Sequence, residues 1–140
     1  MTPVSALGLD IGRRRVGVAG CDGTGLIATG LTTIHRQSFA QLLTDIQQIA
    51  LARQAQVLVV GLPLTMNGEE GVQARQVRKV ANGLSQALDL PVIYVDERLS
   101  SVEAEQLMRE AGHSVAYDKA LIDRKAAAII LQRWLDERRL

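Results

Sequence analysis

The sequence predicts one α/β domain, built on a mixed five-stranded sheet with helices on both faces. The first third of the chain holds three short apolar segments separated by turn residues, which is the pattern of an antiparallel meander. Two later apolar runs alternate with helical patterns, and right-handed crossovers would make them parallel neighbours in the same sheet. The 140 residues, 47% of them apolar, suffice for one buried core, so we expect a single domain over residues 1–140.

The meander is expected to consist of strands over residues 4–9, 16–21 and 26–34. The first of these segments ends at Asp10-Ile11-Gly12, and the second ends at the turn sequence Asp22-Gly23-Thr24-Gly25. The third is rich in Thr and Ile, which favour extended backbone.

A first helix is expected from Ser38 to about Gln54. Ser38 with Gln41 three residues later is a capping-box pattern, which marks the start of a helix. Apolar residues then recur at helical spacing and predict an inward-facing stripe of Phe39, Leu42, Leu43, Ile46, Ile49 and Ala50.

The second half alternates strands and helices. Residues 57–60 are a continuous apolar run, as in a strand buried on both faces, and residues 92–95 form a similar run. Between them, residues 69–88 predict an amphipathic helix. Two more helices are expected over residues 101–111 and 119–138. Their inward-facing residues are expected to be Ala104, Leu107, Met108 and Ala111 in the former and Ala126, Ala127, Ile130, Leu131 and Trp134 in the latter.

Composition and charge exclude several classes of protein. Sixteen Lys and Arg against fifteen Asp and Glu leave a net charge of +1, so no global field attracts nucleic acid or an anionic membrane. Cys21 is the single cysteine and can form neither an internal disulfide nor a CxxC metal site. No apolar run approaches the roughly 18 residues of a membrane span, and the first residues lack a signal-peptide pattern. We therefore expect a cytoplasmic protein with no membrane partner.

Acidic residues stand where two of the predicted strands end. Asp10 ends the first strand, and Asp96 and Glu97 end the last. In open α/β sheets the binding crevice lies beyond the carboxyl ends of the strands. A lone Asp at such a place is more often a cap of a turn or helix than a catalyst, but two strand ends together favour a site.

The final helix supplies a third acidic group, Asp123. It precedes Ala126, Ala127 and Ile130 by three, four and seven residues and so lies on the same helical face. The two alanines are small and would let the helix approach the sheet, which would bring Asp123 to the strand ends. The alternative is a partly exposed Asp favoured by the helix dipole.

Carboxylates converging without His or Cys form an all-oxygen site that suits Mg²⁺ or Mn²⁺. Two such ions can activate a water and stabilise the leaving oxygen during attack on a phosphodiester, so metal replaces a general base. His35 and His113 are expected to be ordinary surface residues. The pattern therefore indicates phosphoryl-transfer chemistry around Asp10, Glu97 and Asp123.

Basic residues near this rim could hold a phosphate backbone, although a solvated surface would have the same composition. Thirteen of the sixteen are Arg, which suits bidentate phosphate contacts, but codon bias produces the same excess. The candidate residues are Arg13, Arg14, Arg15, Arg98, Lys119, Arg124 and Lys125. With so few aromatic residues, recognition of backbone and shape is expected rather than base stacking.

The chain resembles the YqgF/RuvX family of Holliday-junction-resolvase-like proteins and nucleases that process the 5′ end of precursor 16S ribosomal RNA. The resemblance covers nearly the whole chain. It rests on Leu9-Asp10-Ile11-Gly12 with Arg15-Val16-Gly17-Val18-Ala19, on Val60-Gly61-Leu62-Pro63, on Asp96-Glu97-Arg98-Leu99-Ser100 with Val102-Glu103-Ala104, and on Ile122-Asp123 with Ala126-Ala127.

This resemblance implies an RNase H-like fold and catalytic roles for Asp10, Glu97 and Asp123 around divalent metal. Asp96 belongs to the matched motif, but we expect it to orient Arg98 or the loop. The family pattern carries a proline where this chain has Thr29-Gly30-Leu31, a position that we expect to be remote from the acidic cluster.

Four functions remain open at this point. The main hypothesis is a metal-dependent nuclease acting on precursor 16S rRNA, with precursors of the ribosomal subunit as further candidate partners. A resolvase acting on branched DNA would use the same carboxylates. The turn from Asp10 to Gly12 also resembles the phosphate loop of actin and sugar kinases, but those enzymes need two such domains. A non-catalytic ribosome-assembly module would gain little from a costly carboxylate cluster. The sequence does not indicate an oligomeric state.

Overall fold

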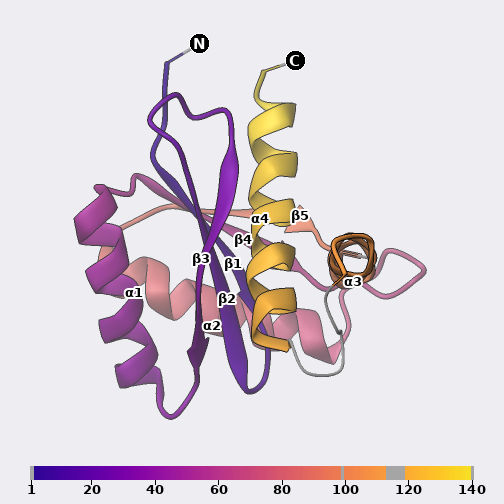
Figure 1. The fold of residues 1–140 in the computed structure, drawn as a ribbon. Coiled ribbons are helices and arrows are strands. Elements are labelled where there is room, and N and C mark those ends of the chain that lie inside the picture. Colours follow the sequence, from indigo (N-terminus) through magenta and orange to yellow (C-terminus); the bar gives the residue numbers. More distant parts are fainter. Residues whose placement is uncertain (1, 99, 113–118, 140) are drawn as a thin grey trace.

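The structure, a computed structural model, describes residues 2–98, 100–112 and 119–139. Within these residues the chain forms one five-stranded sheet in the order β3-β2-β1-β4-β5 and four helices (Figure 1). The strands are β1 (Ala6–Ile11), β2 (Arg15–Cys21), β3 (Ala28–His35), β4 (Val57–Leu62) and β5 (Val92–Asp96). The helices are α1 (Phe39–Arg53), α2 (Val72–Leu88), α3 (Ser100–Glu110) and α4 (Lys119–Glu137).

The predicted meander and crossovers are confirmed. β1 pairs antiparallel with β2, which pairs antiparallel with β3. β1 pairs parallel with β4, and β4 with β5, so these three strands end at the same edge of the sheet. That edge is where the sequence places Asp10 and Glu97.

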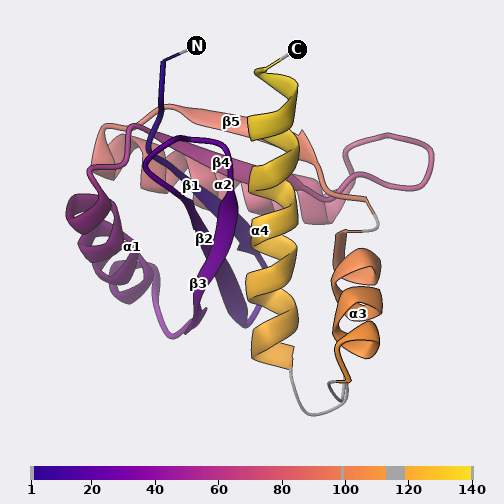
Figure 2. The ribbon, with the colours of Figure 1, turned by 45° about the horizontal axis from the view of Figure 1, so that its top comes forward.

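Helices cover both faces of the sheet (Figures 1 and 2). On one face α1 and α2 pack over an apolar cluster that includes Leu7, Leu9 and Val60. On the other face α4 packs over a cluster that includes Ala6, Val59 and Ala127. α3 lies against α4, through a third cluster of Ala104, Met108, Ile122 and Ala126. None of the described helices is both long and apolar enough to cross a membrane.

Several boundaries differ from the predicted ones. β1 continues two residues beyond the predicted strand because Asp10 and Ile11 still pair with β2, so Asp10 lies inside the strand. α2 begins at Val72 rather than residue 69, since Gly71 occupies its N-cap position. The residues before it form a loop in which the backbone N–H of Thr65 donates to Glu69 O at 2.8 Å.

The start of α1 agrees with the sequence, but one residue of its predicted stripe does not. The hydroxyl of Ser38 accepts a hydrogen bond from the backbone N–H of Gln41 at 3.1 Å, as a capping residue should. Phe39, by contrast, leaves 43% of its surface exposed. In α3 two residues expected to face inward, Leu107 and Ala111 beyond its end, are likewise exposed.

Glycines on the strands allow α4 to lie directly on the sheet. A Cβ on Gly17 of β2 would lie 2.0 Å from the backbone oxygen of Asp123. A Cβ on Gly8 of β1 would lie 2.8 Å from the oxygen of Ala127 and 2.7 Å from the Cβ of Leu131. The small residues predicted on the helix therefore face glycines on the sheet. This close contact determines how far Asp123 lies from the sheet.

Gly17→Ala is therefore expected to destabilise the fold by about 1–3 kcal/mol, the usual cost of overpacking, because α4 must move away from β2. Gly23→Ala is the matched control, since a Cβ there meets nothing within 4 Å. Urea unfolding of both variants measures the difference. Equal midpoints for the two variants would mean that this close contact is not needed.

Candidate active site

Asp10 and Glu97 come together across β4. β4 lies between β1 and β5, and Glu97 directly follows β5, where its backbone N–H donates to Leu62 O at 3.2 Å. The Glu97 side chain lies over Gly61 of β4: a Cβ on Gly61 would be 3.0 Å from the Cβ of Glu97 and 3.1 Å from its Oε2. The absence of a side chain at Gly61 thus gives Glu97 room to reach Asp10, to which it is hydrogen-bonded.

Both carboxyl groups hold protons more tightly than usual. Burial raises the pKa of Asp10 from 3.8 to about 6; the hydrogen bond with Glu97 lowers it, and the charge of Asp123 raises it further. Burial also raises the pKa of Glu97 from 4.5 to about 8, and the charge of Asp10 and the hydrogen bond with it add to the effect. Both carboxyl groups therefore resist losing their protons when no cation is bound, and Glu97 does so more strongly than Asp10.

Asp123 lies on the same cavity but has a different partner. Its Oδ2 accepts a hydrogen bond from Arg15 Nε at 2.6 Å, in an ion pair whose side chains are 19% and 30% exposed. Arg15 is among the basic residues expected to hold a phosphate backbone, and the structure places it in contact with the third carboxylate. Arg15 opens β2 and Asp123 lies in the first turns of α4, so this pair joins the helix to the sheet.

The three predicted carboxylates line one cavity of about 360 Å³ at the carboxyl edge of the sheet. Its other lining residues come from the end of β1 and the turn after it, the loops after β4 and β5, and the starts of α2 and α3: Ile11, Gly12, Pro63, Leu64, Gln73, Arg98 and Val102. In the part of the chain that the structure describes, no three Asp, Glu, His or Cys side chains are already close enough to share one ion. Asp10 and Glu97 therefore form a close pair, and Arg15 holds Asp123 on the same cavity beside that pair.

The donor set fits a hard divalent cation. Asp10 and Glu97 offer carboxylate oxygens, and their raised pKa values reflect a place where a positive charge would be favourable. Asp123 can contribute an oxygen of the same kind, on the same cavity. Mg²⁺ and Mn²⁺ both prefer such oxygen ligands, so the residues do not distinguish the two ions.

Arg98 lines the cavity but is fixed by Asp96, as the sequence predicts. Its Nη2 lies 2.8 Å from Asp96 Oδ2, and its Nη1 donates to Met66 O at 3.2 Å. The same ion pair and a backbone hydrogen bond from Arg98 hold the pKa of Asp96 below its usual value. Asp96 therefore orients the loop, and Glu97 provides the carboxyl group of the site.

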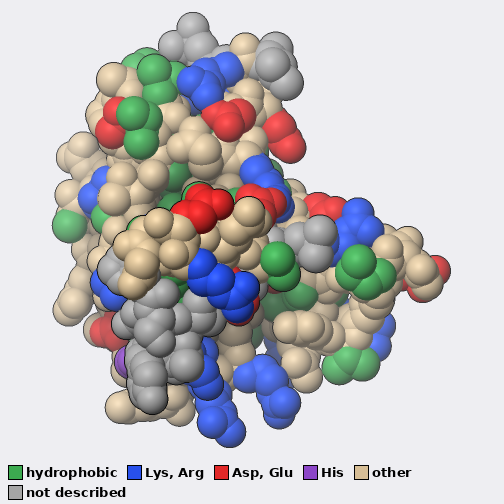
Figure 3. All heavy atoms as spheres, turned by 45° about the vertical axis from the view of Figure 1, so that its right-hand side comes forward, with side chains coloured by type: hydrophobic (Ala, Val, Ile, Leu, Met, Phe, Trp, Pro, Cys, Tyr) green, Lys and Arg blue, Asp and Glu red, His purple; other side chains and the backbone are tan. Residues whose placement is uncertain are grey.

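The remaining basic candidates lie on the β1–β2 turn and on α4, and none of them lines the acidic cavity. Arg13 and Arg14 are exposed in the turn between β1 and β2. Arg124 and Lys125 are half-buried on α4, and Lys119 is exposed at its start. Figure 3 shows Lys and Arg side chains gathered along the lower edge of the face that carries α3. Of the two histidines, His35 is exposed at the end of β3, and His113 lies outside the described residues.

Gly30, where the chain departs from the family pattern, lies under α4. A Cβ on Gly30 would be 3.1 Å from both the Cβ and the backbone oxygen of Arg124, the residue after Asp123. Gly30 is on β3, with β2 between it and the strand that carries Asp10, and it does not line the acidic cavity.

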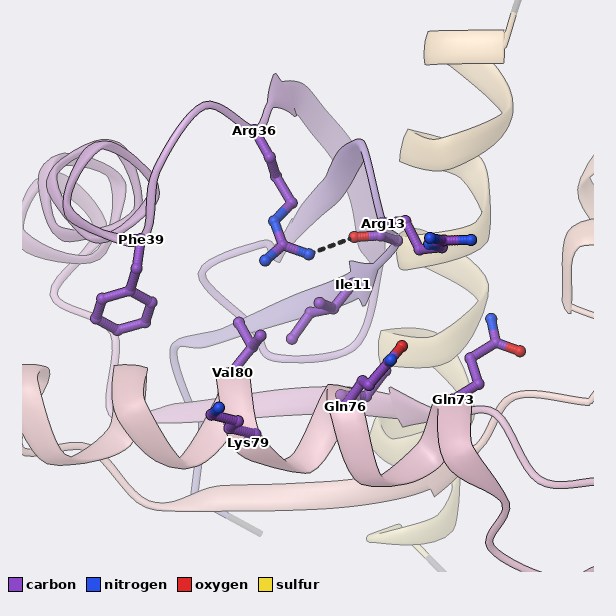
Figure 4. Close-up of a pocket in the computed structure, with 10 residues that line it drawn as sticks. Ile11, Arg13, Arg36, Phe39, Gln73, Gln76, Lys79 and Val80 are labelled. Atoms are coloured by element: carbon purple, nitrogen blue, oxygen red, sulfur yellow. Dashed lines mark hydrogen bonds between the residues drawn. The ribbon is translucent and has the colours of Figure 1, made fainter.

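The sequence reasoning missed a second hollow, of about 570 Å³, beside the acidic cavity (Figure 4). Besides Arg13, its polar lining residues are Arg36, Gln73, Gln76 and Lys79, and Gln73 lines both hollows. The Gln and Lys residues belong to the polar surface of α2, where periodicity does not distinguish a site from ordinary solvated residues. No signal in a single sequence brings α2 beside the β1–β2 turn.

Comparison with known proteins shows the family. The model described as "RuvX: Holliday junction resolvase" matches residues 4–137. The chain belongs to the RuvX family. A relative from Acaryochloris marina named "Putative pre-16S rRNA nuclease" is 59% identical over 138 residues, which cover 99% of this chain and 96% of that protein. A relative of the same name from Trichormus variabilis is 62% identical over 136 residues, which cover 97% and 90%.

Solved structures show the same fold at low sequence identity. RuvC of Thermus thermophilus, solved in complex with a Holliday junction substrate, matches with a TM-score of 0.60 at 12% identity, over 97% of this chain and 96% of that one. The fowlpox virus resolvase, solved with Holliday junction DNA, also has a TM-score of 0.60, at 9% identity, over 96% and 99%. The RNase H-like fold implied for this RuvX protein is thereby confirmed.

Asp10→Asn is expected to raise the melting temperature of the metal-free protein, and the gain should grow with pH. Both raised pKa values mean that the folded chain binds protons more tightly than the unfolded one, so the free energy of unfolding falls as pH rises toward 8. The variant lacks one of the two negative charges that repel each other. Above pH 8 we expect it to melt higher by about 3 °C or more, equivalent to roughly 1 kcal/mol. Scanning fluorimetry in chelator across pH measures this.

Asp123→Asn is the comparison variant: the charge of Asp123 has the smallest of the effects on Asp10, and its removal also breaks the ion pair with Arg15, so any gain should be smaller. Added Mg²⁺ or Mn²⁺ should stabilise the wild type more than Asp10→Asn, by about 2.7 kcal/mol when the free ion is at 100 times its Kd. If wild type and Asp10→Asn melt alike at every pH, with and without ion, these carboxyl groups do not form a shared site.

Proposed function

We propose that this protein is a divalent-metal-dependent nuclease that hydrolyses phosphodiester bonds at the 5′ end of precursor 16S rRNA. The observation that carries the proposal is the Asp10–Glu97 carboxyl pair, half-buried on a cavity at the carboxyl edge of the sheet. The name shared by relatives 59–62% identical to this chain supports the choice of substrate.

Asp10, Glu97 and Asp123 are the residues that would hold the metal, Mg²⁺ or Mn²⁺. When bound, such ions activate a water and stabilise the leaving oxygen. Because the pKa values of Asp10 and Glu97 are raised, both must lose their protons to bind the ion, so loading should be weaker at low pH. Arg15 holds Asp123 through the hydrogen bond from its Nε, and Asp123 lines the cavity.

Other residues would position the substrate. Arg13 and Arg14 stand exposed on the β1–β2 turn, directly after the strand that carries Asp10, and can hold the phosphate backbone. Arg124 and Lys125 follow Asp123 on α4 and can serve the same purpose. Arg98 is held by Asp96 and keeps the loop after β5 in place, with a smaller part in binding.

Cleavage of branched DNA is the second candidate function. The family description and the junction-bound RuvC neighbour favour it, but that neighbour is only 12% identical and supports the fold alone. A binding-only assembly factor has less support, because a half-buried pair of carboxyl groups that repel each other costs stability without adding a contact. Precursor rRNA as substrate would place the protein in the cytoplasm, with ribosomal subunit precursors as its partners.

Asp10→Asn, Glu97→Gln and Asp123→Asn are each expected to abolish metal-dependent cleavage while leaving the fold intact. Each keeps the side chain's shape but removes a negative oxygen, and the loss should exceed the roughly 10–100-fold that outer-shell changes at metal sites cause. The assay incubates each variant with precursor 16S RNA fragments and with four-way DNA junctions, in Mg²⁺ or Mn²⁺. Full cleavage by any variant removes that residue from the site, and preferential cleavage of junctions favours the resolvase.

Arg14→Ala is expected to weaken binding of precursor RNA without changing the cleavage rate at saturation. An exposed phosphate contact positions the backbone, so its loss should lower the slope of log affinity against log salt by about one. Arg139→Ala removes an exposed Arg at the far end of α4 and is the control. Fluorescence anisotropy at several salt concentrations measures the slopes. Equal slopes for the two variants would mean that Arg14 is an ordinary surface residue that makes no phosphate contact.

A further inference from the structure

The hollow beside the acidic cavity has the lining of an anion site with an apolar wall. Arg13, Arg36 and Lys79 supply three cations, and Gln73 and Gln76 supply two amides. None of the described lining residues is acidic. At about 570 Å³ the hollow lies within the roughly 300–1,000 Å³ range of small-ligand sites. Charge and size together suit a group that carries a phosphate.

The fold holds one of the three cations, Arg36, in position. Arg36 Nη1 donates to the backbone oxygen of Gly12 at 2.8 Å, which holds its guanidinium over the turn between β1 and β2 (Figure 4). Its backbone N–H also donates to Arg14 O at 2.8 Å. Arg36 is half-buried, and because this hydrogen bond already fixes its guanidinium beside the hollow, binding a ligand would cost little further side-chain freedom.

The apolar wall includes an exposed aromatic ring. Phe39 belongs to the apolar stripe of α1 that is expected to face the core, yet 43% of its surface is exposed. The edge of its ring rests on α2, where a Cβ on Gly83 would lie 3.0 Å from Phe39 Cζ. Val80 continues this wall, and Figure 4 shows both side chains on the side of the hollow away from Arg13. A planar ring can stack there, since an exposed aromatic face accepts any base.

The hollow is continuous with the acidic cavity around the end of β1. Ile11, Gly12 and Gln73 line both. Along β1, Ile11 packs in the cluster under α1 and α2, whereas Asp10, one residue earlier, points to the opposite face of the sheet. A chain that leaves the carboxyl pair can therefore pass the tip of β1 and reach Arg36 and Phe39 on the other face.

We propose that this hollow holds an unpaired nucleotide of the substrate strand next to the scissile phosphate. Its phosphate would contact Arg13, Arg36 and Lys79, and its base would lie against Phe39 and Val80. The proposal rests on the proposed function, because it assigns the adjoining subsite of the same nucleic acid. It adds a requirement that the carboxylates do not impose, namely a single-stranded segment beside the cleavage site.

The test compares two RNA hairpins in chelator, so that binding is measured apart from cleavage. One has a blunt stem, and the other carries a short single-stranded extension with 2-aminopurine, a fluorescent base. We expect wild type to bind the extended hairpin more tightly and to change its 2-aminopurine fluorescence. Phe39→Leu keeps apolar volume without a ring and should lose about fivefold to tenfold in affinity for the extended hairpin alone. Lys79→Gln should weaken the same complex and lower its salt slope by about one.

Arg139→Gln is the matched control and should bind both hairpins as wild type does. If Phe39→Leu and Lys79→Gln also bind both as wild type does while wild type cleaves RNA, the subsite is refuted and the proposed function stands. If both variants lose affinity equally for the blunt and extended hairpins, the hollow contacts duplex, and the unpaired nucleotide is refuted. If wild type neither binds nor cleaves either RNA, the proposed function and the subsite both fail.

Discussion

The contact between the carboxyl groups of Asp10 and Glu97 is the constraint on which the rest of the site depends. Two acidic groups in one half-buried place repel each other unless a proton or a cation lies between them. The fold accepts this cost because β1, β4 and β5 are parallel and end together, with Gly61 leaving room above β4. When no ion is bound, a proton on one of the two groups would relieve this repulsion, and because that proton must leave, ion binding should depend on pH.

Much of this arrangement could be predicted from one sequence. Apolar runs and turn residues gave the meander and the crossovers, and the shared edge of parallel strands then placed Asp10 near Glu97. The spacing of Asp123 from Ala126 and Ala127 correctly placed it toward the sheet. These predictions succeed because they use strand direction and helical period, which are properties of the backbone.

Other features depend on which side chains meet, and one sequence does not carry that information. The Arg15–Asp123 ion pair joins residues 108 positions apart. Phe39 matches the helical period of α1, but its side chain stays partly exposed. It is the first residue of the helix, and its ring lies at the edge of α2. The hollow beside the acidic cavity unites the β1–β2 turn, the end of β3, and α2, and each of these reads as ordinary polar surface by itself.

The glycines beneath α4 have a consequence for how such a site persists through evolution. Where Gly17 meets the backbone oxygen of Asp123, main chain rests on main chain with no side chain between them. The position of Asp123 is then determined by the geometry of the backbone and not by a set of interlocking side chains. Backbone geometry changes more slowly in evolution than side chains do. Substitutions on the outward face of α4 can accumulate without moving Asp123, whereas a single added methyl on β2 displaces it. Variation in this lineage should therefore be uneven, tolerant on the helix and strict at a few strand positions.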